Sequence, residues 1–239
     1  MILLGPGSSV THDALRLLAR HGTLLAAVGQ DGVRCYTAPP LMPDRSDVAR
    51  RQAELWGSPR RRISVARHMY TLRLGEVLPD RDLDTLRRIE GARVKTIYRL
   101  MADKYGIEWT GRNYDRANPG AADIPNQAVN HAATAVQAAA ALAVQAIGAL
   151  PQLGFIHEDS GHSFVLDIAD LFRDTLTMEI AFAAARKISN GATETVDRLV
   201  RREAATAFRK HQLIPSMIDR IKQVLRLENP SGLGHDSDT

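Results

Sequence analysis

Residues 128–150 read AVNHAATAVQAAAALAVQAIGAL, and this stretch decides the fold class. Alanine is the strongest helix former, and its small side chain lets neighbouring helices approach closely. Asn130, His131, Gln137 and Gln145 interrupt the apolar run, which makes it unsuitable for crossing a membrane. Only 5% of the 239 residues are aromatic while 44% are hydrophobic. We therefore expect a long core helix packed closely against other helices.

Helical patterns occupy nearly all of the chain around this segment. Prolines at positions 59, 79, 119, 151 and 215 fall near their joints, where helices begin or end. The expected helices cover roughly residues 45–56, 60–75, 82–105, 124–149, 163–189, 193–210 and 212–227. The prediction is a mainly α protein with a helical domain over residues 45–228.

The first 37 residues differ, because they read as a small β-rich domain. MILL at the start predicts a strand, and Thr23–Val28 and Val33–Thr37 flank a GQDG turn, which predicts a hairpin. A short helix ending at Arg20 would be capped by Ser8 or Ser9. Residues 38–44 hold three prolines and predict a linker, and residues 229–239 predict a disordered tail.

The charge and the cysteine content indicate what kind of partner and which compartment suit the protein. The net charge of +4 and a pI of about 9.4 suit a polyanionic partner. Cys35 is the single cysteine, so no intrachain disulfide can form, and it is expected to be a small buried side chain. The N-terminus has no signal-peptide pattern. We expect a cytoplasmic protein that does not associate with membranes.

The most informative polar residues lie in GFIHEDSGHSFVLDIADLFRD, residues 154–174. Asp167 and Asp170 are three positions apart in an apolar run, so a helix would place both carboxylates on one face. Buried carboxylates need compensation, either from arginine or lysine or from a metal ion. His157 could add a nitrogen ligand, or be a hydrogen-bonded core histidine. A zinc site with His162 lacks further ligands at recognised spacing.

Glu90 is a second polar residue in an apolar helical pattern. It is followed by Gly91 and Ala92, which would let a partner helix approach closely. An ion pair with Arg87 or Arg93 is the simpler reading, and periodicity alone does not bring Glu90 to Asp167.

Arginines cluster between residues 45 and 73, among them Arg60, Arg61 and Arg62. The guanidinium fork suits phosphate, although such a run is usually a solvated face. In WTGRNYD, residues 109–115, aromatic side chains flank Arg112; they could stack on bases or anchor the loop.

Several of these segments together resemble one family. They are GPGSSVTHDALRLLARHGTLLAAVGQDGVRCY, MYTLRLGE, RRIEGARVKTIYRLMADKYGIEWTGRNYD, PNQAVNHAAT and GFIHEDSGHSFVLDIADLF. In this order they resemble the universal integrase of CRISPR adaptation, in its Cascade-associated (type I-E) branch. The resemblance implies a β-rich N-terminal domain followed by an all-helical catalytic domain.

The resemblance also implies a catalytic, metal-binding set formed by Glu90, His157, Asp167 and Asp170. Family members join the 3′-hydroxyl ends of a DNA fragment to a CRISPR array by transesterification, and also cleave branched DNA. Carboxylate ligands imply Mg²⁺ or Mn²⁺, and the histidine favours Mn²⁺. The residues implied to contact DNA are Arg34, Arg60, Arg61, Arg62, Arg112, Tyr114 and Arg173.

The implied partners are double-stranded protospacer DNA with 3′ ends, CRISPR repeat DNA, a second copy of the chain, and a smaller ferredoxin-like adaptation protein. Relatives of this branch begin earlier, so we expect an N-terminally shortened β domain. Ser160 stands where the family has lysine, and Gln137 where it can have a tyrosine. These departures leave two alternatives: a catalytically impaired DNA-binding scaffold, or a helical protein whose acids form internal ion pairs.

Overall fold

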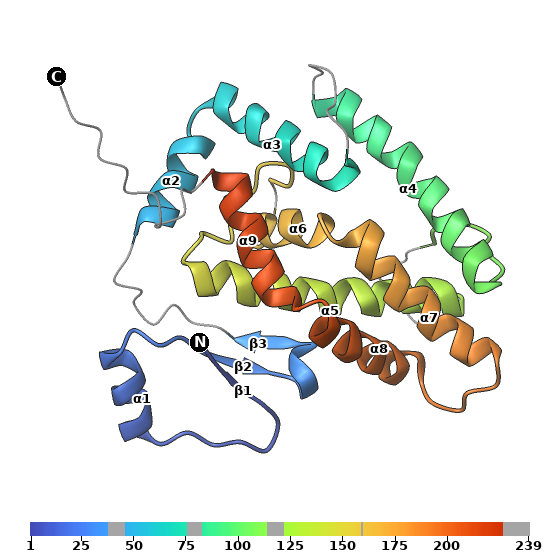
Figure 1. Cartoon of the computed structure of the whole chain (residues 1–239), viewed down its shortest axis with the longest axis horizontal. Helices are drawn as coiled ribbons and strands as arrows, with labels where there is room; N and C mark the ends of the chain where they lie inside the picture. Colours follow the sequence, from blue (N-terminus) through green and yellow to red (C-terminus); the bar gives the residue numbers. More distant parts are fainter. Residues whose placement is uncertain (38–45, 76–82, 114–121, 159, 227–239) are drawn as a thin grey trace.

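The computed structural model describes residues 1–37, 46–75, 83–113, 122–158 and 160–226. The mainly α fold with a small N-terminal sheet is confirmed (Figure 1). The predicted linker and tail lie outside the described residues. The helices are α1 (His12–Arg20), α2 (Asp47–Trp56), α3 (Pro59–Leu74), α4 (Leu83–Tyr105), α5 (Ile124–Ile147), α6 (Ser163–Asp170), α7 (Met178–Ser189), α8 (Val196–Lys210) and α9 (Leu213–Leu225).

The N-terminal sheet has the order β1-β2-β3, with β1 (Ile2–Leu4), β2 (Leu25–Val28) and β3 (Cys35–Thr37). β1 runs parallel to β2, and α1 connects them. β2 and β3 are antiparallel, so the predicted hairpin is confirmed. The predicted cap of α1 is wrong: Thr11, not Ser8 or Ser9, accepts the backbone N–H of Ala14 at 3.2 Å.

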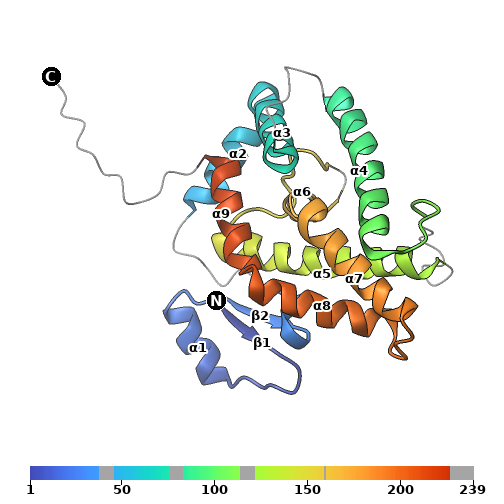
Figure 2. The same cartoon turned by 45° about the vertical axis from the view of Figure 1, so that its right-hand side comes forward.

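The alanine-rich helix α5 forms the centre of the helical part, with α6, α7, α8 and α9 packed around it (Figures 1 and 2). Twelve of its side chains are buried, and seven of these are alanine. Small side chains allow this close packing on several sides. Leu142 of α5 also packs with Ala26 and Val28 of β2, which joins the sheet to the helices.

The helix predicted over residues 163–189 is interrupted. α6 ends at Asp170, and residues 173–177 form a π-helical turn before α7 begins. The N–H of Thr177 bonds the carbonyl of Phe172, five residues earlier, at 3.1 Å. Such turns often occur at functional sites, because the extra residue redirects side chains. Here the turn follows directly after Asp170 and includes Arg173 and Asp174.

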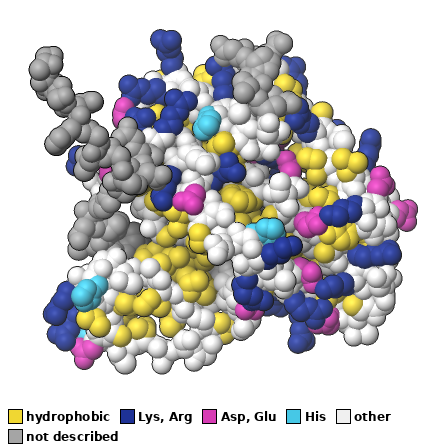
Figure 3. Space-filling model, viewed as in Figure 1, with side chains coloured by type: hydrophobic (Ala, Val, Ile, Leu, Met, Phe, Trp, Pro, Cys, Tyr) yellow, Lys and Arg dark blue, Asp and Glu magenta, His cyan; other side chains and the backbone are white. Residues whose placement is uncertain are grey.

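Apolar side chains gather on the surface of the N-terminal sheet and α1, at the lower left of Figure 3. Ile2, Leu3, Leu15 and Leu17 are each more than a third exposed. In the described part of the chain, no helix is both long enough and apolar enough to span a bilayer.

Candidate active site

Asp167 is a fully buried residue of α6, and the loop that precedes this helix folds around its carboxylate. Its Oδ2 accepts the backbone N–H groups of Phe155 and Ile156, at 2.6 and 3.1 Å. Its Oδ1 accepts the N–H of His157 at 3.0 Å and contacts His157 Nδ1 at 2.7 Å. Both oxygens are therefore occupied, and the side chain has 0% exposure. The carboxylate compensates its own burial by folding the loop around itself.

His157 is held in one orientation by this contact. With Nδ1 facing Asp167, the other ring nitrogen, Nε2, lies 3.9 Å from Asp170 Oδ2. A carboxylate that accepts Nδ1–H leaves the lone pair of Nε2 available in the neutral ring. The hydrogen bond to Asp167 raises the pKa of His157. Burial raises the pKa of Asp170, although Arg173, 3.4 Å away, acts in the opposite direction.

Helix α2 fixes the backbone of the same loop from the other side. Buried Gln52 donates to the carbonyls of Leu150 and Leu153, both at 2.9 Å, and accepts the N–H of Leu150 at 2.7 Å. Trp56 Nε1 donates to the carbonyl of Gly154 at 3.0 Å. A Cβ at Gly154 would lie 2.7 Å from Ser163 Cβ, so only glycine fits at this close approach.

Glu90 reaches the same region from α4 and is paired with an unexpected residue. Its Oε1 accepts Nη1 of Arg73, and its Oε2 accepts the Tyr70 hydroxyl at 3.2 Å. The sequence offered Arg87 or Arg93 as the partner of Glu90, but Glu90 pairs with Arg73, whereas Arg87 pairs with Asp84 at 3.3 Å. Both partners of Glu90 come from α3, which packs beside α4.

Glu90, His157 and Asp170 line one cavity of about 920 Å³, together with Arg87 and Arg173. Asp167 is not among the residues that line it. Of the four residues predicted as ligands, three line this cavity, and the fourth, Asp167, contacts His157 Nδ1.

These three donors fit a hard divalent cation by their chemistry, because two carboxylates and an imidazole suit Mg²⁺ or Mn²⁺. Within the described residues, however, no three His, Cys, Asp or Glu side chains are grouped closely enough to hold an ion. Glu90 is engaged by Arg73, so it would have to turn away from that partner to join the other two.

Known proteins similar in sequence to this chain indicate its family. A family model described as CRISPR associated protein Cas1 matches residues 70–196. A CRISPR-associated endonuclease Cas1 of Escherichia coli K12 is 38% identical over 225 residues, covering 94% of this chain and 72% of that protein. The chain belongs to the Cas1 family. A second relative, from Rhodospirillum rubrum, is 37% identical over 94% of the chain and 73% of its own length.

Solved structures of the Cas1 family have the same fold. The crystal structure of a TtCas1–DNA complex matches with a TM-score of 0.84 and 34% identity, over 95% of this chain and 83% of that one. A casposase bound to its integration product matches with a TM-score of 0.66 but only 16% identity, which shows a shared fold.

The arginines predicted to contact DNA in this Cas1 chain lie in different settings. Arg173 lines the active-site cavity and also a neighbouring cavity that contains Lys95 and Arg99. Arg112 bonds the side chains of Asn126 and Asn130 and so anchors its own loop. In that loop, Trp109 stacks on Tyr98 with ring centroids 4.7 Å apart, which supports the anchoring reading for this tryptophan.

Arg60, Arg61 and Arg62, the candidates from α3, do not line the cavity that holds the three donors. Arg61 pairs with Glu54, and Arg62 pairs with Glu158 and lies over the ring of Trp56. Arg60 is exposed at the start of α3. Tyr114 lies outside the described residues.

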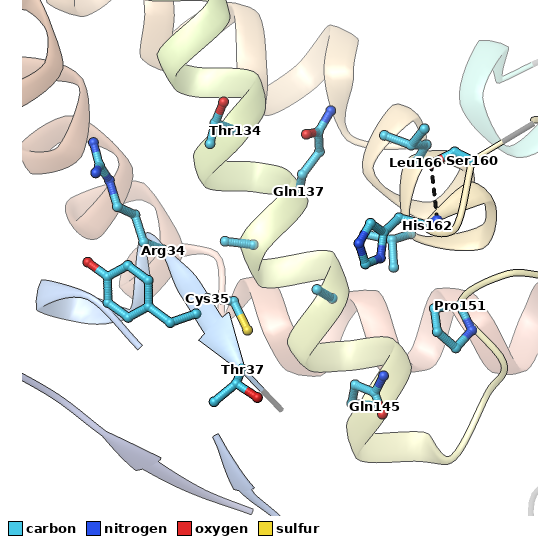
Figure 4. Close-up of a pocket in the computed structure, with 14 residues that line it drawn as sticks. Arg34, Cys35, Thr37, Thr134, Gln137, Gln145, Pro151, Ser160, His162 and Leu166 are labelled. Carbon is cyan, nitrogen blue, oxygen red and sulfur yellow. Dashed lines mark hydrogen bonds between the residues drawn. The ribbon is translucent and has the colours of Figure 1, made fainter. Parts of the chain in front are cut away.

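A second cavity of about 720 Å³ adjoins the first, and the two share Ser160 and Leu166. Figure 4 shows Gln137 of α5 and His162 at its wall, with Arg34 across from them on the side of β3. Arg34 is held there by Asp197 of α8 at 2.7 Å. Gln137 and Ser160, the two positions at which a departure from the family pattern was predicted, both line this second cavity.

Sequence reasoning missed Gln52, Tyr70, Arg73 and Asp174. Their partners lie 17 to 101 positions away in the chain. The one available signal was that Tyr70 and Arg73 are three apart and thus share a face of α3.

Proposed function

We propose that the chain is a divalent-metal-dependent DNA endonuclease and integrase that inserts spacer DNA into a CRISPR array. The observation that carries this proposal is the convergence of Glu90, His157 and Asp170 on one cavity that also holds Arg87 and Arg173. Carboxylates and arginines on the walls of one cavity suit a phosphodiester and the cation that accompanies it. Membership of a family whose relatives are named endonucleases supports the same conclusion.

In the proposed reaction, a DNA 3′-hydroxyl attacks a phosphodiester, so that one P–O bond forms as another breaks. Arg87 and Arg173 bind the phosphate oxygens and orient the bond. Asp167 keeps His157 turned so that Nε2 faces the cavity. The DNA supplies the nucleophile, so no activated serine or cysteine is required. A bound Mg²⁺ or Mn²⁺ would supply Lewis-acid stabilisation of the charge on the attacking and leaving oxygens.

The ligand chemistry favours Mn²⁺ over Mg²⁺, although both are proposed to support activity. Mg²⁺ binds mainly oxygen ligands, whereas an imidazole nitrogen is a better ligand for Mn²⁺. Activity with Mn²⁺ exceeding that with Mg²⁺ at equal concentration is the expected result.

The proposed partners are double-stranded protospacer DNA with 3′ ends, CRISPR repeat DNA, a second copy of this chain and a smaller ferredoxin-like protein, as in the type I-E branch. The apolar surface formed by Ile2, Leu3, Leu15 and Leu17 favours association with another protein. Light scattering of the purified chain tests the homodimer: twice the mass of 26.2 kDa is expected, and a monomer at all concentrations would contradict it.

Cleavage of branched DNA tests the enzyme directly. The chain is expected to cut the substrate with Mn²⁺ or Mg²⁺ and not with EDTA, and Asp170→Ala and His157→Ala should abolish cutting. Asp13→Ala, which removes an 82% exposed carboxylate on α1, is the matched control and should retain activity. Undiminished cleavage in both site variants would refute the proposal.

The alternative function is a DNA-binding scaffold without catalysis. It is favoured by the engagement of Glu90 with Arg73 and by Ser160 in place of the family's lysine. It predicts salt-sensitive DNA binding with no metal-dependent product.

A further inference from the structure

A buried arginine lies behind the active-site cavity. Arg73, near the end of α3, has a side chain only 4% exposed and does not line the cavity itself. A buried guanidinium requires close anionic partners, because removing its charge from water is costly. The acids that surround it therefore determine what it does.

Arg73 forms hydrogen bonds with two acids, Glu90 and Asp174, and interacts with the charge of a third, Asp170. Its Nη1 bonds Glu90, and its Nε and Nη2 bond the two oxygens of Asp174, each at 3.2 Å. Burial acts to lower the pKa of Arg73, but the hydrogen bonds to Asp174 and the charges of Glu90 and Asp170 outweigh it and raise that pKa. Arg73 is thus a protein-supplied counter-cation for two of the three donors proposed to hold the metal.

The ion pairs of Arg73 with Asp174 and with Glu90 differ in the number of guanidinium nitrogens that take part. Asp174 engages two nitrogens of the guanidinium, a bidentate arrangement, whereas Glu90 engages one. If Glu90 turned away, Arg73 would still be paired and would not be left as an isolated buried charge. The bond to Glu90 is therefore the one that can be exchanged.

We propose that Arg73 is a positioning residue that holds Glu90 in the metal-free protein and releases it when a divalent cation enters the cavity, while Asp174 retains the arginine. This inference rests on the proposed metal-dependent function. It explains why the three donors share a cavity without forming a closed group of ligands in the described residues. Arginine and cation compete for the same carboxylate.

Calorimetric titration with MnCl₂ tests this competition without any activity assay. Arg73→Met removes the competing charge, so Mn²⁺ affinity should rise about tenfold. The melting temperature without metal should fall, because Glu90 and Asp174 lose their partner, and the rise in melting temperature on adding Mn²⁺ should grow. Arg51→Met is the matched control: it removes an arginine of α2 that pairs with Glu54, and should leave Mn²⁺ affinity unchanged.

A second pair of variants keeps the test decisive if Arg73→Met does not fold. Asp174→Asn weakens the second anchor, so Arg73 should hold Glu90 more strongly and Mn²⁺ affinity should fall severalfold. In a Glu90→Gln background neither substitution should change the affinity, because the shared carboxylate is gone. Unchanged affinity in Asp174→Asn, or changes of the same size in the Glu90→Gln background, would overturn the inference.

The parent protein separates this inference from the proposed function. A parent chain that binds Mn²⁺ and cleaves branched DNA, combined with an Arg73→Met variant of unchanged affinity, refutes only the role of Arg73. A parent chain that neither binds Mn²⁺ nor cleaves DNA refutes both.

Discussion

The two sides of the candidate active-site cavity hold Glu90 and His157 in different ways. On the side of His157, backbone N–H groups, Asp167 and Gln52 fix the loop through hydrogen bonds between buried groups. On the side of Glu90, the contacts to the carboxylate among the described residues come from two side chains of α3, Tyr70 and Arg73. The position of His157 is therefore fixed largely by hydrogen bonds of the loop backbone, whereas the position of Glu90 depends on an ion pair with Arg73.

In the proposed metal site, this difference gives the two sides different parts in binding the ion. A preorganised imidazole costs little conformational entropy when an ion binds, since its ring is already oriented. A carboxylate that must leave an arginine adds a competing interaction and so lowers affinity. We expect the His157 side to set the geometry of the site and the Glu90 side to set its affinity.

The largest effect is expected where both sides meet, at Asp170. Asp170→Ala removes a proposed ligand that lies beside His157 Nε2, so the rate of Mn²⁺-dependent DNA cleavage should fall by more than about a hundredfold, beyond the usual effect of an outer residue. Initial rates at saturating Mn²⁺ provide the measurement. Asp219→Ala, a change at a 70% exposed acid of α9, is the control and should leave the rate unaltered.

A smaller loss is expected from Asp167→Asn, which tests whether the fixed side acts through orientation. The amide can donate where the carboxylate only accepts, so it would disrupt the contacts to the loop and to His157 Nδ1. Mn²⁺ affinity should fall about 10- to 100-fold, the range for residues that orient a ligand. Equal affinity in this variant would show that the ring needs no such support.

Two glycines, one on each side, compare the packing of the two regions. Gly154→Ala would force a Cβ against Ser163 and should destabilise the protein by about 2 kcal/mol. Gly91→Ala, next to Glu90 on α4, meets nothing within 4 Å and should stabilise the helix by roughly 0.5 kcal/mol. Urea unfolding of both variants measures the difference, and equal effects would mean that the two sides are packed alike.

A loss of stability without direct loss of a proposed ligand is also expected at Gln52. Gln52→Met leaves the N–H of Leu150 and two carbonyls of the loop without their partner, which should cost about 1–3 kcal/mol of unfolding free energy. Gln152→Met, at an exposed position of the same loop, should cost nothing. A loss of equal size in both variants would indicate that the hydrogen bonds of Gln52 do not hold the loop.

The sequence predicted the fold in close detail because its signals are local. Prolines near the joints and the alanine-rich run located the helices, and the hairpin followed from its turn residues. The predicted helix over residues 163–189 was wrong in one respect, the π-helical turn after Asp170. Nothing in FVLDIADLFRD indicates that turn, because one extra backbone residue leaves no distinct pattern.

The site was predictable only in part, since its contacts join distant segments. Periodicity placed Asp167 and Asp170 on one face, and the family resemblance brought in Glu90 and His157. The distinct task of Asp167 depends on three backbone N–H groups ten to twelve residues upstream. Arg73 was missed because its partners, Glu90 and Asp174, lie 17 and 101 positions away.

The most direct test of a metal site shared by the two sides is electron spin-echo modulation of the protein loaded with Mn²⁺. A nitrogen bound to the ion produces characteristic ¹⁴N modulation, which we expect in the parent chain. The signal should persist in His162→Ala, a change at the neighbouring cavity, and vanish in His157→Ala. Modulation that survives in His157→Ala, or none in the parent chain, would contradict a metal site built on Glu90, His157 and Asp170.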